Sequence, residues 1–135
     1  MTAHIETLLP AAIRAAFPGV RVVTELPADL ADVTPCVRVA GIGGTADQHR
    51  FASARVDIDA YDVEHDGMSA RENARNLAQQ IHDWAIEDLP GQIIAGVSVL
   101  SVSDVMAPKW TPHDNTTLRR FTLTIGLRLH DRSVA

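Results

Sequence analysis

Apolar and polar residues alternate over two long segments of the chain. Residues 51–61 place apolar side chains on one face, and the other face carries Arg55, Asp57, Asp59 and Tyr61. Residues 118–129 repeat the pattern with Phe121, Leu123, Ile125, Leu127 and Leu129 on the apolar face. Successive side chains of a strand point to opposite faces, so each segment predicts a strand with one buried face. Shorter strands are predicted at 21–24, 36–42 and 93–105, and the alternation of the last slips at Val99–Leu100, which predicts a bulge.

Two other segments repeat apolar residues at helical spacing. The first covers residues 5–17 and contains Pro10, which removes a backbone donor and predicts a kink or a late helix start. The second begins at Ser69 and Glu72, which match a capping box, and Pro90-Gly91 ends it. Its apolar face consists of Ala70, Ala74, Leu77, Ala78, Ile81, Trp84, Ala85 and Leu89.

The segments between these elements are predicted to be loops. Residues 25–35 form a polar connection that is long enough to be functional or mobile. Gly41, Gly43 and Gly44 begin a polar stretch, so strands 36–42 and 51–61 are expected to form a hairpin with a long, flexible tip. Residues 106–117 are predicted to be a loop, and residues 130–135 a frayed tail.

The order of elements predicts an α+β fold in one domain, residues 1–135. Strands with one apolar face are typical of antiparallel sheets. We therefore expect a two-layer sandwich, in which two amphipathic helices pack on one face of a mainly antiparallel sheet of four to five strands. The polar face of that sheet would lie in water or against a neighbouring subunit.

Composition narrows the class of protein. The apolar fraction of 46% is that of a folded domain, and the net charge of -5 disfavours non-specific binding to DNA phosphates. Cys36 is the single cysteine, so no intrachain disulfide can form. No apolar run reaches the roughly 18 residues that span a bilayer, and the N-terminus lacks a signal-peptide pattern. We expect a protein made in the cytoplasm that does not bind membranes.

The densest group of potential metal ligands is an acidic run, consisting of Asp57, Asp59, Asp62, Glu64, His65 and Asp66. Such oxygen-rich runs can hold calcium or magnesium, but this one lacks the spacing and the glycine of a calcium loop. Asp57 and Asp59 would also lie roughly 7 Å apart along a strand and need not converge. We interpret the run as a solvated or ion-paired strand face followed by an acidic turn, and expect no metal.

Other catalytic signatures are missing from the sequence. The six histidines show no HExxH spacing, and Ser69 and Ser101 lie in no GxSxG elbow. Cys36 is expected to be a buried apolar residue, and the glycines at 41–44 lack the Gly-Lys-Ser/Thr ending of a phosphate loop. We expect no catalytic residues and no cofactor.

The segment 106–120 is the most distinctive. Trp110 lies between Pro108 and Pro112 in a stretch without a helical or strand pattern to bury it. Tryptophan and arginine are the residues most enriched at binding hot spots, which predicts a protein interface here. In the alternative interpretation, Trp110 folds back over the sheet edge and caps the core, while Asp114 and Asn115 only build a turn.

Four pieces of the chain together resemble the tail terminator family of long-tailed bacteriophages, particularly those of actinobacteriophages. The pieces are Phe17-Pro18-Gly19-Val20-Arg21-Val22 with Glu25-Leu26-Pro27; Pro35-Cys36-Val37-Arg38-Val39 with Gly43-Gly44; Ala54 to Tyr61 before an Ala/Arg-rich helix; and Pro108 to Asn115 with Arg119-Arg120-Phe121. They span nearly the whole chain, and none is a catalytic signature.

The resemblance implies a structural role in a virion. Such proteins form rings, usually hexamers of one chain, which cap the head-proximal end of the tail tube, end its growth and dock to a head-completion or connector protein. DNA would pass through the lumen without specific binding. A ring needs a heterologous interface. We expect interface residues at Asp57, Asp59, Lys109, Trp110, Pro112, Asp114, Asn115, Arg119, Arg120 and Arg128.

Within or between subunits, Asp57 and Asp59 are expected to meet arginines such as Arg119, Arg120 or Arg128. Two alternatives remain open at this point. The chain could be a head-completion or connector subunit of the same junction, which sequence features separate poorly from a terminator. It could also be a small ligand-binding or enzymatic cytoplasmic domain, which requires a pocket with converging titratable groups.

Overall fold

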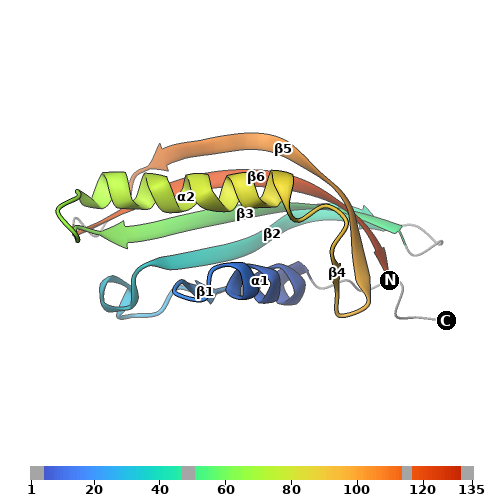
Figure 1. Cartoon of the computed structure of the whole chain (residues 1–135), viewed down its shortest axis with the longest axis horizontal. Helices are drawn as coiled ribbons and strands as arrows, with labels where there is room; N and C mark the ends of the chain where they lie inside the picture. Colours follow the sequence, from blue (N-terminus) through green and yellow to red (C-terminus); the bar gives the residue numbers. More distant parts are fainter. Residues whose placement is uncertain (1–4, 47–50, 114–116, 132–135) are drawn as a thin grey trace.

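The computed structural model describes residues 5–46, 51–113 and 117–131. The helices and strands are shown in Figure 1. In chain order they are α1 (Ile5–Ala16), β1 (Arg21–Val23), the 3-10 helix η1 (Leu30–Val33), β2 (Cys36–Ala46), β3 (Phe51–Val63), α2 (Ala70–Glu87), β4 (Ile93–Ile94), β5 (Val97–Thr111) and β6 (Leu118–Asp131).

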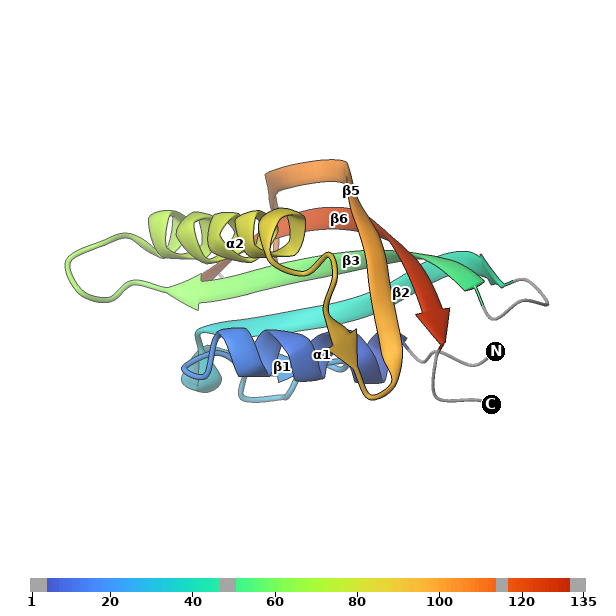
Figure 2. The same ribbon diagram turned by 45° about the vertical axis from the view of Figure 1, so that its right-hand side comes forward.

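The strands form one curled sheet in the order β1-β2-β3-β6-β5-β4. Every neighbouring pair is antiparallel except β1 and β2, which are parallel. Helix α2 packs on β3, β6 and β5, and α1 packs on β2 and β1, both on the same side of the sheet (Figure 2). The predicted α+β sandwich is therefore confirmed. The segment 93–105 gives two strands because a turn with positive φ at Ala95 and Gly96 divides it.

The main core lies between the helices and the sheet, as the alternation predicts. Val56, Ile58 and Ala60 of β3 are fully buried there, and the apolar positions of β6 lie beside them. Helix α2 faces the sheet with Ala74, Leu77, Ala78, Ile81, Trp84 and Ala85, all of which are buried. The capping box is present: the Ser69 hydroxyl accepts a hydrogen bond from the Glu72 amide at 3.2 Å.

Helix α1 does not start late. Residues 5–9 are already helical, so Pro10 lies inside the helix, where it is buried against the core. The helix is fixed to the sheet at its beginning, because the carboxylate of Glu6 accepts a hydrogen bond from the amide of Gly41 at 3.2 Å. Tertiary packing thus outweighs the missing backbone donor.

A second, smaller core lies on the opposite face of the sheet. Residues 25–35, including η1, cover Tyr61, Cys36 and Leu118, all of which are almost completely buried. Tyr61 therefore lies on the same face of β3 as Asp57 and Asp59, as predicted, but it is buried there. Cys36 is the buried residue that the sequence predicted, and burial raises the pKa of its thiol.

The glycine segment is a strand, so the connection between β2 and β3 is shorter than the long tip that was expected. Gly41, Gly43 and Gly44 all belong to β2, which pairs with β3 through a bulge between Gly41 and Gly43. A Cβ on Gly44 would lie 2.0 Å from the carbonyl oxygen of Ser53, so the close ladder itself requires glycine. The connection at 47–50 lies outside the described residues.

The predicted loop at 106–117 is also largely wrong, because β5 continues to Thr111. Its register to β6 shifts between Val99 and Ser101, as predicted, and again between Asp104 and Met106 and between Met106 and Lys109. These irregularities erase the alternation of apolar and polar residues along β5. Pro108 is tolerated because this part of β5 has no second neighbouring strand among the described residues. Likewise β6 includes His130 and Asp131, which were expected to fray.

Candidate interaction surface

The sheet face opposite the helices is polar and carries excess positive charge. We call it the outer face, and its charged residues within 36–46, 51–63, 97–111 and 118–130 are Arg38, Arg55, Lys109, Arg120, Arg128, Asp57 and Asp59. The outer face therefore holds five of the twelve basic residues of the chain but only two of the seventeen acidic ones. Exposed Glu25, Asp29 and Asp32 lie in the segment that covers the Tyr61 end of this face, so the excess of positive charge is confined to the uncovered strands around Arg55 and Arg128.

Both carboxylates of the outer face are engaged within the chain. The guanidinium of Arg38 reaches one oxygen of Asp59 at 2.7 Å, and the hydroxyl of Thr122 donates to the other at 2.6 Å. Thr124 donates to Asp57 at 2.5 Å. Burial alone would lower the pKa of Arg38, but its hydrogen bond to Asp59 and the charge of that carboxylate outweigh burial and raise it. Within the chain the arginine partner of Asp59 is Arg38 and not Arg119, Arg120 or Arg128, and the expected contacts between subunits stay a prediction.

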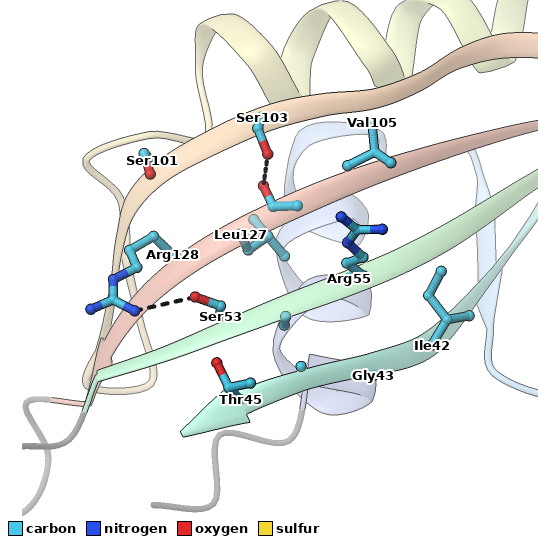
Figure 3. Close-up of a pocket in the computed structure, with 13 residues that line it drawn as sticks. Ile42, Gly43, Thr45, Ser53, Arg55, Ser101, Ser103, Val105, Leu127 and Arg128 are labelled. Atoms are coloured by element: carbon cyan, nitrogen blue, oxygen red, sulfur yellow. Dashed lines mark hydrogen bonds between the residues drawn. The ribbon is translucent and has the colours of Figure 1, made fainter. Parts of the chain in front are cut away.

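Of the remaining cations, Arg55 and Arg128 line a groove, and Lys109 lies outside it. Arg55 and Lys109 are exposed, and Arg128 is exposed while it donates to the Ser53 hydroxyl at 3.2 Å. The groove holds about 420 Å³ and crosses β2, β3, β6 and β5. In Figure 3, Arg55 and Arg128 lie on this face, and Ile42 and Val105 flank Arg55 from β2 and β5.

Small residues hollow this groove. Ser101 and Ser103 line it from β5, and Gly126 lies beneath them on β6. A Cβ on Gly126 would come within 2.6 Å of the Ser103 hydroxyl, so the close approach of the two strands favours glycine there. Ile42 and Val105, respectively 49% and 42% exposed, add apolar surface beside the guanidinium of Arg55. A groove lined by serine and glycine and bordered by arginine and apolar side chains is compatible with a protein interface.

Trp110 lies on the helix-covered side of β5, away from the outer face. It pairs in register with Phe121, and the guanidinium of Arg71 from α2 lies 5.0 Å from the centre of its ring. The indole remains 43% exposed. Trp110 therefore partly folds onto the sheet edge, as the alternative interpretation held, and still offers apolar surface to a partner.

The predicted interface residues divide into two groups. Asp57, Asp59, Lys109, Arg120 and Arg128 share the outer face, where Arg120 donates to the carbonyl of Pro112 at 2.5 Å. Trp110 and Arg119 line a cleft near the start of α2 instead. Asp114 and Asn115 lie outside the described residues. Arg38 and Arg55 complete the outer face, and only the pairing register of the strands could have added Arg38.

The acidic run does not converge on one point. Asp57 and Asp59 lie on the outer face, whereas Asp62 is turned to His65 with 2.9 Å between carboxylate and imidazole. Asn73 donates to the carbonyls of Val63, His65 and Met68, so the turn before α2 is held by its own hydrogen bonds. Within 5–46, 51–113 and 117–131, no three His, Cys, Asp or Glu residues gather as metal ligands. None of the described helices is long and apolar enough to cross a membrane.

Comparison with known proteins supports the fold. Neither a protein-family model nor a curated protein sequence matches the chain. Its fold is similar to that of a chain in a solved structure described as the virion of native gene transfer agent (GTA) particle, with a TM-score of 0.66. The similarity covers 96% of this chain and 99% of that chain, at 15% sequence identity. At this low identity, what the two chains are shown to share is the α+β fold over nearly their full lengths.

Proposed function

We propose that this chain is a structural subunit of a phage-like virion, which acts by binding other proteins and not by catalysis. The observation that carries the proposal is the fold similarity to a chain of a gene transfer agent virion, which leaves almost no part of either chain unmatched. The outer face, with its engaged carboxylates and exposed cations, supports a role in docking.

Within the virion we propose the position of a tail terminator. Copies of the chain form a ring, which we take to be a hexamer, on the head-proximal end of the tail tube. The ring ends tube growth and presents its other side to the head-completion or connector protein. The four sequence pieces that resemble tail terminators support this position, because three of them lie on β2, on β3 and on the β5–β6 hairpin. DNA passes through the lumen without specific contacts.

Binding to the two neighbours tests this position. The chain is incubated separately with tail tubes and with the connector protein from the same phage-like element, and each mixture is sedimented. A tail terminator binds the tube end in substoichiometric amounts and stays bound when the tubes are isolated. Binding to the connector alone would instead identify a head-completion subunit. Binding to neither, together with turnover of a small molecule, would contradict the structural role altogether.

A further inference from the structure

A second charged surface lies at the end of α2, and its sign is opposite to that of the outer face. We call it the acidic helix end, and it consists of Asp83, Glu87, Asp88 and Asp104. His82 joins it together, since its imidazole nitrogens lie 3.2 Å from Asp104 and 3.7 Å from Asp83. All four carboxylate residues are exposed, and the last turn of α2 contains no basic residue.

These carboxylates occupy an electrostatically unfavourable place. The carbonyl groups at the C-terminus of a helix carry partial negative charge, which favours lysine or arginine there and disfavours Asp or Glu. Asp88, the residue that ends α2, and Glu87 before it are both acidic. Asp83 accepts a hydrogen bond from the side-chain amide of Gln79 at 2.8 Å, but the last turn of α2 has no basic residue to offset Glu87 and Asp88. A cationic partner would neutralise the carboxylates and the helix end together.

The two surfaces cannot meet within one molecule. Helix α2 covers one side of the sheet (Figure 1), and Arg55 and Arg128 lie on the outer face, which is the other side (Figure 3). The basic surface of one copy can therefore reach an acidic helix end only on another copy. Contacts between two different patches propagate from subunit to subunit and close into a ring when the rotation permits.

We propose that the groove on the outer face of one copy receives the acidic helix end of the next copy. Arg55 and Arg128 pair with Glu87 and Asp88, whose side chains are exposed at the end of α2. This inference rests on the proposed ring and names the two surfaces that build it. Charges arranged in this way fix the register and order of subunits.

Two charge-reversed proteins test the contact. The sheet variant carries Arg55→Glu and Arg128→Glu, and the helix variant carries Glu87→Arg and Asp88→Arg. Mass photometry and sedimentation measure self-association at rising concentration and at low and high salt. Each variant alone is expected to self-associate at least about tenfold more weakly than wild type. An equimolar mixture is expected to recover assembly when the two variants alternate. The acidic groove of the sheet variant then meets the basic helix end of the helix variant, and the other two surfaces, both wild type, meet each other.

Control variants separate docking from folding and from net charge. Glu25→Arg with Asp29→Arg makes the same charge change as the helix variant on exposed residues far from it, and wild-type self-association is expected. Arg55→Gln with Arg128→Gln removes charge without reversing it, and an intermediate loss is expected. Circular dichroism and thermal melting verify that each protein folds, and the recovery in the mixture verifies it independently.

Three results would overturn the inference. Wild type that stays monomeric at every concentration and salt would exclude docking between copies. Rings that persist in both reversed variants would exclude these two surfaces while leaving the proposed virion role intact. A sheet variant that forms normal rings but loses retention of duplex DNA would assign the outer face to nucleic acid. The proposed virion role is tested separately, by the binding of the chain to tail tubes.

Discussion

Arg38 on β2 donates two hydrogen bonds to the same carboxylate oxygen of Asp59 on β3, at 2.7 Å and 3.0 Å. The other oxygen of Asp59 accepts from Thr122 on β6, so one carboxylate connects three neighbouring strands. Only 3% of the Asp59 surface is exposed. The pair therefore orders the outer face from within, and the guanidinium of Arg55 beside it is exposed.

Replacement of Asp59 is expected to cost stability. Asp59→Ala leaves the guanidinium of Arg38 and the hydroxyl of Thr122 without their acceptor in a half-buried place. The free energy of unfolding should fall by about 1–3 kcal/mol, measured by urea denaturation. Asp57→Ala is the matched control, because Asp57 is less buried and accepts from Thr124 alone, and it should cost less. Equal losses for the two variants would contradict a special role of Asp59.

The N-cap of α2 offers a local test of helix stability. Ser69→Ala removes the hydroxyl that accepts from the amide of Glu72. We expect a loss of about 1 kcal/mol in the free energy of unfolding. Ser101→Ala on the exposed outer face serves as control and should change it by less than about 0.5 kcal/mol. A Ser69 variant as stable as that control would show that the cap does not matter.

Two glycines should respond differently to alanine. Gly44→Ala places a Cβ 2.0 Å from a backbone oxygen of β3, which cannot move without breaking the ladder. Gly126→Ala meets only the hydroxyl of Ser103, which can rotate away. Denaturation should show a loss of at least about 2 kcal/mol for Gly44→Ala and a smaller one for Gly126→Ala. The reverse order would mean that the β2–β3 ladder is not as close as described.

His65 provides a pH-dependent signal. The hydrogen bond that His65 donates to Asp62, followed by the one that it donates to Asp66, raises the pKa of His65 above its ordinary value of 6.5. A raised pKa in the folded state stabilises folding below the unfolded pKa, and this contribution is lost as pH rises through the folded pKa. The stability advantage of wild type over His65→Gln should therefore shrink between about pH 6 and about pH 8.

NMR titration of the His65 ring measures that pKa directly. Asp62→Asn is expected to lower it more than Asp66→Asn, since Asp62 contributes the larger effect. A wild-type pKa at or below 6.5 would be inconsistent with the described hydrogen bonds.

Trp110 reports on partner binding. Trp84 is 8% exposed and Trp110 is 43% exposed, so Trp84→Phe leaves one fluorophore at the surface. Acrylamide should quench this fluorescence readily in the free protein and much less after binding to the tail tube or the connector. Trp110→Ala should weaken that binding, while its stability falls by only about 1 kcal/mol through the lost contact with Arg71. Unchanged quenching in every complex would remove Trp110 from the interface.

The sequence predicts those elements whose signals are local. Alternation identifies β3 and β6, and the Ser69 cap with its apolar stripe identifies α2, because each pattern lies within one segment. Strand β5 beyond Asp104 escapes prediction because two further register shifts scramble its faces. The burial of Tyr61 is not predicted either, because the residues that cover it, 25–35, are far from it in the sequence.

The candidate surface, too, could be predicted only where the signal is local in the sequence. The sequence places Asp57, Lys109, Arg120 and Arg128 among candidate interface residues, and the register of β3, β5 and β6 brings them onto one face. The pairing of Asp59 with Arg38 depends on the alignment of two strands, which no local pattern encodes. The acidic end of α2 looks like an ordinary solvated helix face until the basic outer face is seen opposite it.

The length distribution of tail tubes tests the proposed role most directly. Tube protein from the same phage-like element is allowed to polymerise with and without this chain, and the tubes are imaged by electron microscopy. We expect tubes that stop growing and carry a ring of density at one end when the chain is present. Tubes that elongate equally in its presence, with bare ends and the chain left free in solution, would contradict the account.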